Sequence, residues 1–368
     1  MCGIVGYVGA QQAAPILLEG LQKLEYRGYD SAGIAVLDGS TIELAKACGE
    51  IKNLLAKTHD GSDLHGYIGL GHTRWATHGA PTEANAHPHV SNDGKFAIVQ
   101  NGIIENFMEL REMLQAKGFR FHSETDTEVI VHLLDMYYTG DGNLKDTVLK
   151  TLGRLEGSYA IGILCADCPE QMFLARNGCP LIIGVGAGEN FFASDVTALV
   201  KYTRDVVYMT ALVSHTKNVV YLDDGELAEV RADGYTVFDC TGQPIEKPVS
   251  RVAWDIEAAE KGGYEHFMLK EIMEQPRAIK STLDPRVKDH RVVFDELKMT
   301  DAQLMGFNKI MITACGSAFY AGQAGKYALE KLTHIPVDAD LASEFRYRDP
   351  IVDEHTLMII ISQSGETA

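Results

Sequence analysis

Short apolar runs separated by turn residues dominate the first 240 positions, and they predict β-strands. The runs lie at Ile4–Val8, Ser31–Leu37, Ile42–Ala47, Tyr67–His72, Phe96–Gln100, Tyr159–Cys165, Gln171–Ala175, Leu181–Val185, Phe191–Ala193, Val206–Met209, Val219–Leu222, Glu226–Val230 and Tyr235–Phe238. Helical spacing of apolar residues predicts helices at Pro15–Tyr26, Phe107–Lys117 and Thr125–Tyr138. Because the helices are bunched rather than alternating with strands, the pattern favours a layered α+β domain.

The second part of the chain has a different pattern. Residues 241–262 carry two prolines and mixed charges and read as a linker. A helix is expected over Tyr264–Gln275, ending at Pro276. Strands and helices then alternate as Lys309–Thr313, Ala318–Leu332, Val337–Ala339, Ala342–Tyr347 and Leu357–Ser362. This βαβαβ order predicts a parallel sheet covered on both faces.

Composition narrows the functional classes. At 368 residues two domains are expected, and the formal net charge of −18 argues against nucleic acid or an anionic membrane surface as partner. No apolar run approaches the roughly 20 residues of a membrane helix, and no signal peptide is visible. The seven scattered cysteines predict reduced thiols and a cytoplasmic location.

The opening residues MCGIVGYVGA place a cysteine directly before a predicted strand. Because Met1 precedes a small residue, we expect its removal, which leaves Cys2 as the N-terminal residue. Its α-amino group, with a pKa of about 7.7–8.0, could then act as general base for its own thiol. On this stretch alone, a cysteine that only packs in the core is the better interpretation.

Two further stretches carry candidate binding groups. In GLGHTRWATHGAPTEANAHPH, residues 69–89, Arg74 could grip a carboxylate and Trp75 could cover a ligand, or each could be structural. His87 and His89 have no cysteine or acidic partner at zinc-like spacing, so a metal is not expected. In SETDTEV, residues 123–129, Asp126 could cap a helix or bind an ammonium group.

A third stretch, IVQNGIIENF at residues 98–107, contains Asn101 and Gly102. The pair could be only a turn, or its side-chain amide and backbone N–H could stabilise an oxyanion, worth about 3–4 kcal/mol per donor. Combined with Cys2, Arg74 and Asp126, these groups describe a site that binds an amino acid and attacks its side-chain amide.

The motifs CGIVGY, YRGYDSAG, HTRWATHG, NAHPH, NGIIEN and SETDTE occur in this order and resemble the glutaminase domain of the N-terminal-nucleophile amidotransferases. The resemblance implies a four-layer αββα sandwich that hydrolyses L-glutamine to glutamate and ammonia. It makes Cys2 the nucleophile and Asn101 and Gly102 the oxyanion hole. The implied glutamine-binding residues are Arg74, Thr77, His78, Asp126, Arg27 as a site-lining arginine, and Trp75 as the gate on the ammonia path.

Near the end of the chain, ITACGSA at 312–318 and IISQSGETA at 360–368 each join a strand to a loop rich in small hydroxyl residues. Such turns cradle anions, although a plain serine-rich turn is the alternative, and the lack of a lysine argues against ATP. The pair resembles the sugar isomerase domain. That resemblance implies sugar-phosphate contacts from Cys315, Gly316, Ser317, Ser362, Gln363, Ser364 and Thr367, with Ala318 departing from a frequent serine.

The combination resembles the amidotransferases that aminate fructose 6-phosphate, and it implies a homodimer without metal or cofactor. The expected domains are a glutaminase at 1–240, a linker at 241–262 and an incomplete sugar isomerase domain at 263–368, so the chain alone is expected to act only as a glutaminase. Two alternatives stay open: a phosphoribosyl amidotransferase of purine synthesis, and a sugar-phosphate-sensing regulator. The CxxC at Cys165 and Cys168 is interpreted as two ordinary thiols.

Overall fold

The structure is a computed structural model that describes residues 2–25, 30–76, 79–140, 142–195, 198, 218–251, 264, 266–288, 291–294, 297 and 299–362. The chain divides into two compact units, Met1–Glu260 and Lys261–Ala368. The predicted strand Val206–Met209 lies outside the described residues.

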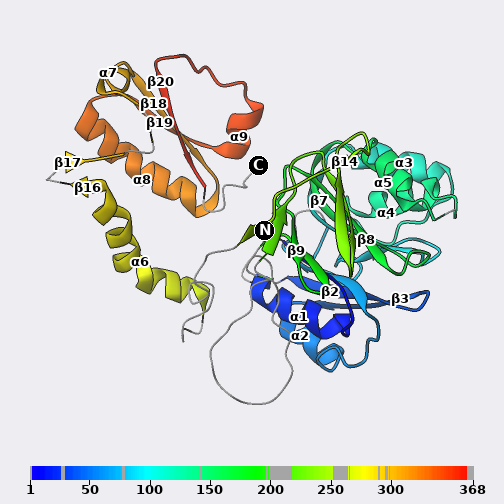
Figure 1. Ribbon diagram of the computed structural model, residues 1–368. Helices are drawn as coiled ribbons and strands as arrows, with labels where there is room; N and C mark the ends of the chain where they lie inside the picture. The colour runs from blue at the N-terminus through cyan, green and yellow to red at the C-terminus, as the bar shows by residue number, and fades with distance from the viewer. Residues whose placement is uncertain are drawn as a thin grey trace. The chain divides into compact units, whose positions relative to one another are not determined.

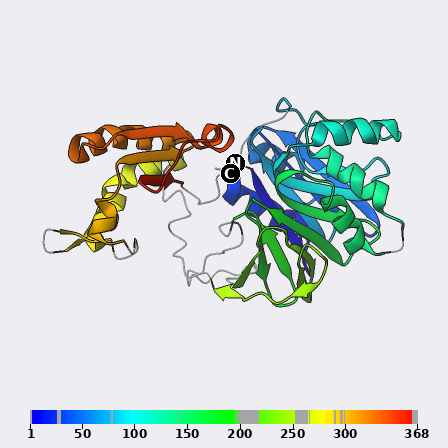
Figure 2. The same cartoon turned by 90° about the horizontal axis from the view of Figure 1, so that it is seen from above.

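The first unit contains two antiparallel sheets (Figures 1 and 2). The eight-stranded sheet has the order β15-β11-β9-β10-β1-β4-β2-β3, and the seven-stranded sheet has the order β14-β13-β12-β8-β7-β6-β5. The bounds of the first sheet are β1 Gly3–Val8, β2 Ser31–Asp38, β3 Thr41–Cys48, β4 Ile68–Arg74, β9 Ile182–Val185, β10 Asn190–Ala193, β11 Asn218–Tyr221 and β15 Ser250–Arg251. Those of the second are β5 His89–Val90, β6 Phe96–Ile104, β7 Gly157–Cys165, β8 Gln171–Asn177, β12 Leu227–Arg231, β13 Gly234–Phe238 and β14 Pro244–Ile245.

Helices cover the outer face of each sheet. The helices α1 (Ala13–Leu24) and α2 (Ile51–Lys57) pack on the eight-stranded sheet, and α3 (Phe107–Ala116), α4 (Glu128–Tyr137) and α5 (Leu144–Leu152) pack on the other (Figure 1). The predicted four-layer αββα sandwich is therefore confirmed. The short helices α2 and α5 were not predicted from the apolar pattern.

Alternation along the strands explains how each sheet is buried on both faces. In β1, Val5 and Tyr7 join the core under α1, whereas Ile4 and Val8 join the core between the two sheets. Because successive side chains of a strand point to opposite faces, an apolar run of this kind requires a cover on each side. A continuous apolar strand in an antiparallel sheet thus predicts an inner layer.

The space between the sheets is narrow at one place. A Cβ atom added to Gly6 would lie 1.8 Å from the ring of Phe192, and one added to Gly162 would lie 2.7 Å from the same ring. Phe192 is completely buried and belongs to the core between the sheets. Two glycines, one on β1 and one on β7, therefore make room for a single aromatic ring.

The second unit is built on a parallel sheet of order β19-β18-β20, which confirms the predicted βαβαβ arrangement. Its elements are α6 Phe267–Leu283, β16 Val287–Lys288, β17 Arg291–Val292, α7 Asp301–Leu304, β18 Lys309–Ala314, α8 Gly316–Thr333, β19 Val337–Leu341, α9 Ala342–Tyr347 and β20 Thr356–Ile361. The central strand is covered on both faces, since neighbouring Met311 and Ile312 are both buried. On the edge strand β20, Ile360 is 73% exposed.

The predicted end of a helix at Pro276 is wrong, because α6 continues through this proline to Leu283. Proline removes one backbone hydrogen bond and crowds the preceding turn, but it does not prevent the following residues from adopting helical dihedrals. Beyond Pro276 the Thr282 hydroxyl donates to the Ala278 carbonyl in regular i to i−4 fashion. Among the described residues, no helix is both long and apolar enough to cross a membrane.

Replacing Gly6 by alanine should lower the free energy of unfolding by about 3 kcal/mol, because the added methyl group overpacks the space filled by Phe192. Urea denaturation measures this change. The matched control is Gly234→Ala, where an added Cβ meets no atom within 4 Å, and a change below about 0.5 kcal/mol is expected. Equal losses in the two variants would contradict this account of the inner layer.

Candidate active site

Cys2 lies at the start of β1, beside the end of β4. The two strands pair with Gly3 opposite Thr73, which brings the residues after β4 to the cysteine. The backbone N–H of Trp75 donates to Cys2 Sγ at 3.2 Å, and the thiol in turn faces the Trp75 carbonyl at 3.6 Å. The Trp75 side chain is 48% exposed.

Burial raises the pKa of the Cys2 thiol above its ordinary value, and the Trp75 N–H opposes this by stabilising the thiolate. At neutral pH the thiol is therefore protonated and needs a base to become a nucleophile. Within the part of the chain that the structure describes, the hydrogen bonds of Sγ go to the backbone of Trp75 and not to a histidine.

Asn101 reaches the same place from the other sheet. Its side-chain Nδ2 donates to the Cys2 carbonyl at 3.1 Å, and its Oδ1 lies 3.0 Å from His72 Nε2. Asn101 is 8% exposed, so its amide is held inside the protein. Residues 99 positions apart in the sequence thus contact each other at the candidate nucleophile.

Gly102 is not part of a turn. It lies within β6 opposite Tyr159, and the strand continues to Ile104. Its φ of +106° and the Ser158 carbonyl oxygen, 2.1 Å from where a Cβ would lie, require glycine at this position. The interpretation of the Asn101-Gly102 pair as a simple turn is therefore wrong.

Arg74 and Asp126 are both buried at 4% exposure. The Arg74 guanidinium donates to the carbonyls of Gly79 and Ala80 at 3.2 and 3.3 Å. The Asp126 carboxylate accepts the backbone N–H of Ile104 at 2.8 Å, next to the end of β6. Helix α4 has Thr127 at its N-cap position, so Asp126 is not the cap.

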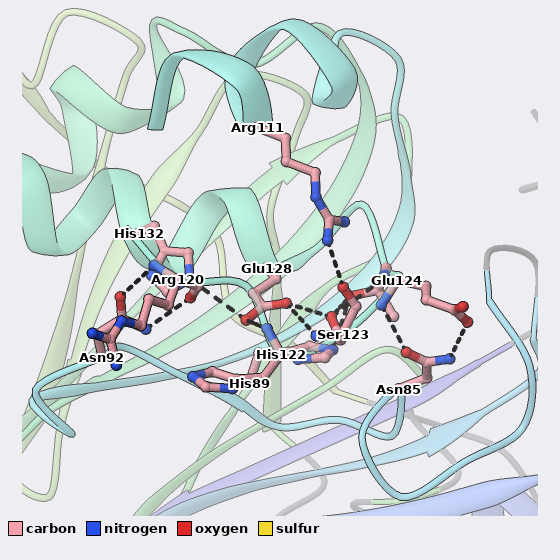
Figure 3. Close-up of polar contacts among 11 residues, drawn as sticks. Asn85, His89, Asn92, Arg111, Arg120, His122, Ser123, Glu124, Glu128 and His132 are labelled. Atoms are coloured by element: carbon pink, nitrogen blue, oxygen red, sulfur yellow. Dashed lines mark hydrogen bonds and ion pairs between the residues drawn. The ribbon is translucent and has the colours of Figure 1, made fainter. Parts of the chain in front are cut away.

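Polar contacts join the loop that follows Arg74 to the loop that carries Asp126 (Figure 3). Asn85 and Glu124 bond reciprocally: the Glu124 N–H donates to Asn85 Oδ1 at 2.8 Å, and Asn85 Nδ2 donates to the Glu124 carboxylate at 3.0 Å. Arg111 donates to the Ser123 carbonyl at 3.0 Å. The loop after β4 and the loop before α4 are thereby fastened to each other.

Glu128 anchors the same loop from the first turn of α4. Its carboxylate accepts the backbone N–H groups of His122 and Ser123, each at 2.7 Å, and the Ser123 hydroxyl at 2.6 Å (Figure 3). The contact with His132 Nε2 at 3.5 Å and these bonds together outweigh burial and lower the pKa of Glu128 to about 2. A carboxylate in the first helical turn is also favoured by the helix dipole. Sequence reasoning missed Glu128, although it stands within the SETDTE motif.

The three histidines 72, 87 and 89 form a buried cluster under the site. The His72 and His87 rings stack with centroids 4.2 Å apart, and His89 meets His87 edge-on at 4.7 Å. Burial lowers the pKa of all three, to about 3 for His72, so they are neutral. Across the described residues, no group of three or more His, Cys, Asp or Glu side chains could hold a metal ion.

In the second unit, the residues predicted to contact a sugar phosphate follow neighbouring strands. Ala314 pairs with Ile361, so Cys315 and Ser362 leave β18 and β20 at the same edge of the sheet. Cys315 is the N-cap residue of α8, Gly316 has a φ of +59°, and Ser317 is exposed at the helix start. The predicted site residues Gln363, Ser364 and Thr367 lie outside the described residues, as do Arg27, Thr77 and His78.

Family comparisons agree with this geometry. The glutamine amidotransferase domain matches residues 46–232, and the SIS domain matches residues 303–368. The chain belongs to the glutamine amidotransferase family. Proteins named glutamine–fructose-6-phosphate aminotransferase [isomerizing] match it over its whole length, with 53% identity in Caldanaerobacter subterraneus, 50% in Clostridium tetani and 46% in Thermus thermophilus. The chain spans 58% of the length of each.

Solved structures show the same type of fold. A structure titled as the allosteric regulatory enzyme of purine biosynthesis shares 28% identity with this chain, with a TM-score of 0.54 over 65% of this chain and 49% of the other. The glutamine phosphoribosylpyrophosphate amidotransferase of B. subtilis has a TM-score of 0.56 at 21% identity, over 92% and 65% of the two chains.

Acidification should destabilise the first unit. The folded-state pKa values of the clustered histidines are depressed, so below about pH 6.5 the unfolded chain binds more protons, and stability falls by up to about 1.4 kcal/mol per pH unit for each histidine. Below about pH 4.5, the lowered pKa of Glu128 further reduces the free energy of unfolding. Urea unfolding at pH 7.5 and pH 5.5 measures the effect.

Two variants separate the cluster from other histidines. His89→Gln should make the pH dependence shallower by about one proton, because glutamine does not titrate. His59 is exposed, and its bond to Asp63 raises its pKa, so it opposes acid destabilisation and His59→Gln should make the pH dependence steeper rather than shallower. If wild type is equally stable at both pH values, the neutral buried cluster is refuted.

Proposed function

We propose that the first unit hydrolyses L-glutamine to glutamate and ammonia, with Cys2 as nucleophile. The observation that carries the proposal is the meeting of Cys2 with Asn101, whose amide lies 3.1 Å from the Cys2 carbonyl. A thiol, an amide donor and a glycine backbone N–H are the groups that acyl transfer from an amide requires.

The reaction begins once Met1 is removed and the α-amino group of Cys2 is free. This amine takes the thiol proton, and Sγ attacks the δ-carbonyl carbon of glutamine. The raised pKa of the buried thiol supports the need for such a base. Asn101 Nδ2 and the Gly102 N–H stabilise the oxyanion, ammonia leaves with the transferred proton, and water hydrolyses the thioester to release glutamate.

The α-carboxylate and α-ammonium groups of glutamine bind beside the two joined loops. Arg74 receives the α-carboxylate, and Asp126 receives the α-ammonium group. Their near-complete burial supports these roles, because charges in a site shielded from water interact strongly. Thr77, His78 and Arg27 complete the contacts, and the half-exposed Trp75 gates the ammonia path.

In the full-length protein, the second unit binds fructose 6-phosphate, which accepts the ammonia. The SIS match and the relatives named as glutamine–fructose-6-phosphate aminotransferases support this acceptor over phosphoribosyl diphosphate. The contacts proposed are Cys315, Gly316, Ser317, Ser362, Gln363, Ser364 and Thr367.

The same proposal assigns the domain boundaries and the partners of the protein. It divides the chain into a glutaminase at 1–240, a linker at 241–262 and a sugar isomerase domain at 263–368, and the two compact units support that division. We infer that the full-length protein is a homodimer that uses glutamine and a sugar phosphate, both cytoplasmic metabolites, and that it does not bind nucleic acid or membranes.

Glutamate release by the purified chain tests the glutaminase. Cys2→Ala should abolish it, and Asn101→Ala should lower kcat by about 10²–10³-fold, because one oxyanion donor is lost. Protein that retains Met1, as checked by mass, should also be inactive, because its Cys2 amine is acylated. Full activity of Cys2→Ala would exclude this function.

Calorimetric titration with fructose 6-phosphate tests the acceptor site. Ser317→Ala should weaken binding about 3- to 10-fold, which corresponds to one hydrogen bond of about 1 kcal/mol. The control is Ser281→Ala, an exposed serine on α6 that is not among the proposed contacts, which should bind like wild type. Unchanged affinity in Ser317→Ala would remove this residue from the site.

A further inference from the structure

His72 connects the two sheets directly beneath the candidate nucleophile. It lies on β4 of the eight-stranded sheet and is completely buried. Its Nε2 lies 3.0 Å from Oδ1 of Asn101, which belongs to β6 of the other sheet. The same asparagine donates through Nδ2 to the carbonyl of Cys2. His72 is therefore two contacts away from the nucleophile.

The proton positions in this chain of contacts follow from chemistry. A backbone carbonyl only accepts, so the end of the Asn101 amide that faces Cys2 is the NH2 group. The end that faces His72 is then a carbonyl oxygen, which also only accepts, and His72 Nε2 must carry a proton. A neutral imidazole has one such proton, so Nδ1 is bare. No described group bonds Nδ1, which agrees with this tautomer.

The tautomer of His72 decides which end of the amide faces the reaction. If Nδ1 carried the proton instead, Nε2 would be an acceptor, and the Asn101 amide would gain by turning its NH2 group toward His72. Its Oδ1 would then face Cys2 and repel a developing oxyanion. We propose that His72 is a positioning residue that holds the Asn101 amide with its NH2 group, rather than its carbonyl oxygen, on the side of the oxyanion.

His87 holds the ring of His72 in place. Its Nδ1 accepts the backbone N–H of Gln100 at 3.3 Å, so its proton is on Nε2, which faces the Thr127 hydroxyl at 3.4 Å. That hydroxyl donates to Gln100 Oε1 at 2.6 Å. The His87 ring is thus bonded at both nitrogens, and His72 stacks on it with an interplanar angle of 15°.

The proposal rests on the glutaminase function proposed above, and a matched pair of substitutions tests it. His72→Gln keeps an N–H donor near the position of Nε2, whereas His72→Met has a similar shape and no donor. With the chain carrying its mature N-terminus, steady-state glutamate release should show kcat at least 10-fold lower in His72→Met, with KM changed less than about twofold. His72→Gln should restore kcat to within about threefold of wild type.

Alkylation of Cys2 by iodoacetamide separates positioning of the amide from damage to the nucleophile. This reaction needs the thiol but no oxyanion donor, so the two variants should react at the wild-type rate. Equal kcat in His72→Met and His72→Gln, or alkylation that falls in parallel with kcat, would overturn the proposal.

The wild-type protein provides a test that does not depend on folding of the variants. Nitrogen-15 NMR of labelled histidine should show His72 neutral with its proton on Nε2, and a proton on Nδ1 would overturn the proposal. If wild type shows no Cys2-dependent glutamate release, the glutaminase function itself is refuted, and NMR still decides the tautomer.

Discussion

The close approach of the two sheets is the constraint on which the rest of the first unit depends. Gly6 and Gly162 leave space for the ring of Phe192, and the strands that carry the site start or end beside this inner core. Only at such a separation can Asn101 of one sheet reach the carbonyl of Cys2 in the other. The packing of small against large residues thus sets distances at the site that no local sequence feature controls.

The buried polar groups next to the site hold one another in position through hydrogen bonds. Glu128 holds the loop before α4, and the histidine cluster holds the Asn101 amide. Buried polar networks of this kind are costly when a member lacks a partner and rigid when its members are satisfied. Rigidity is valuable here, because oxyanion donors that need no reorganisation stabilise a transition state best.

The sequence was sufficient for most of the architecture, because apolar periodicity reports which faces of an element are covered. Even so, α5 was missed, although Asn143 accepts the N–H of Asp146 as a regular N-cap and could have indicated its start. Pro276 was given too much weight as a helix breaker. The contact between His72 and Asn101 could not be predicted, because it depends on how two sheets are superposed rather than on spacing along the chain.

The reciprocal bonds between Asn85 and Glu124 have a consequence for substrate choice. They fasten the loop that follows Arg74 to the loop that carries Asp126, so under the proposed function the amino-acid end of a ligand is held at a fixed distance from Cys2. The site then selects its ligand by the length of the side chain. Asparagine, one methylene shorter than glutamine, would leave its amide carbon out of reach of Sγ when both ends of its backbone are bound, so chain length rather than amide chemistry selects the substrate.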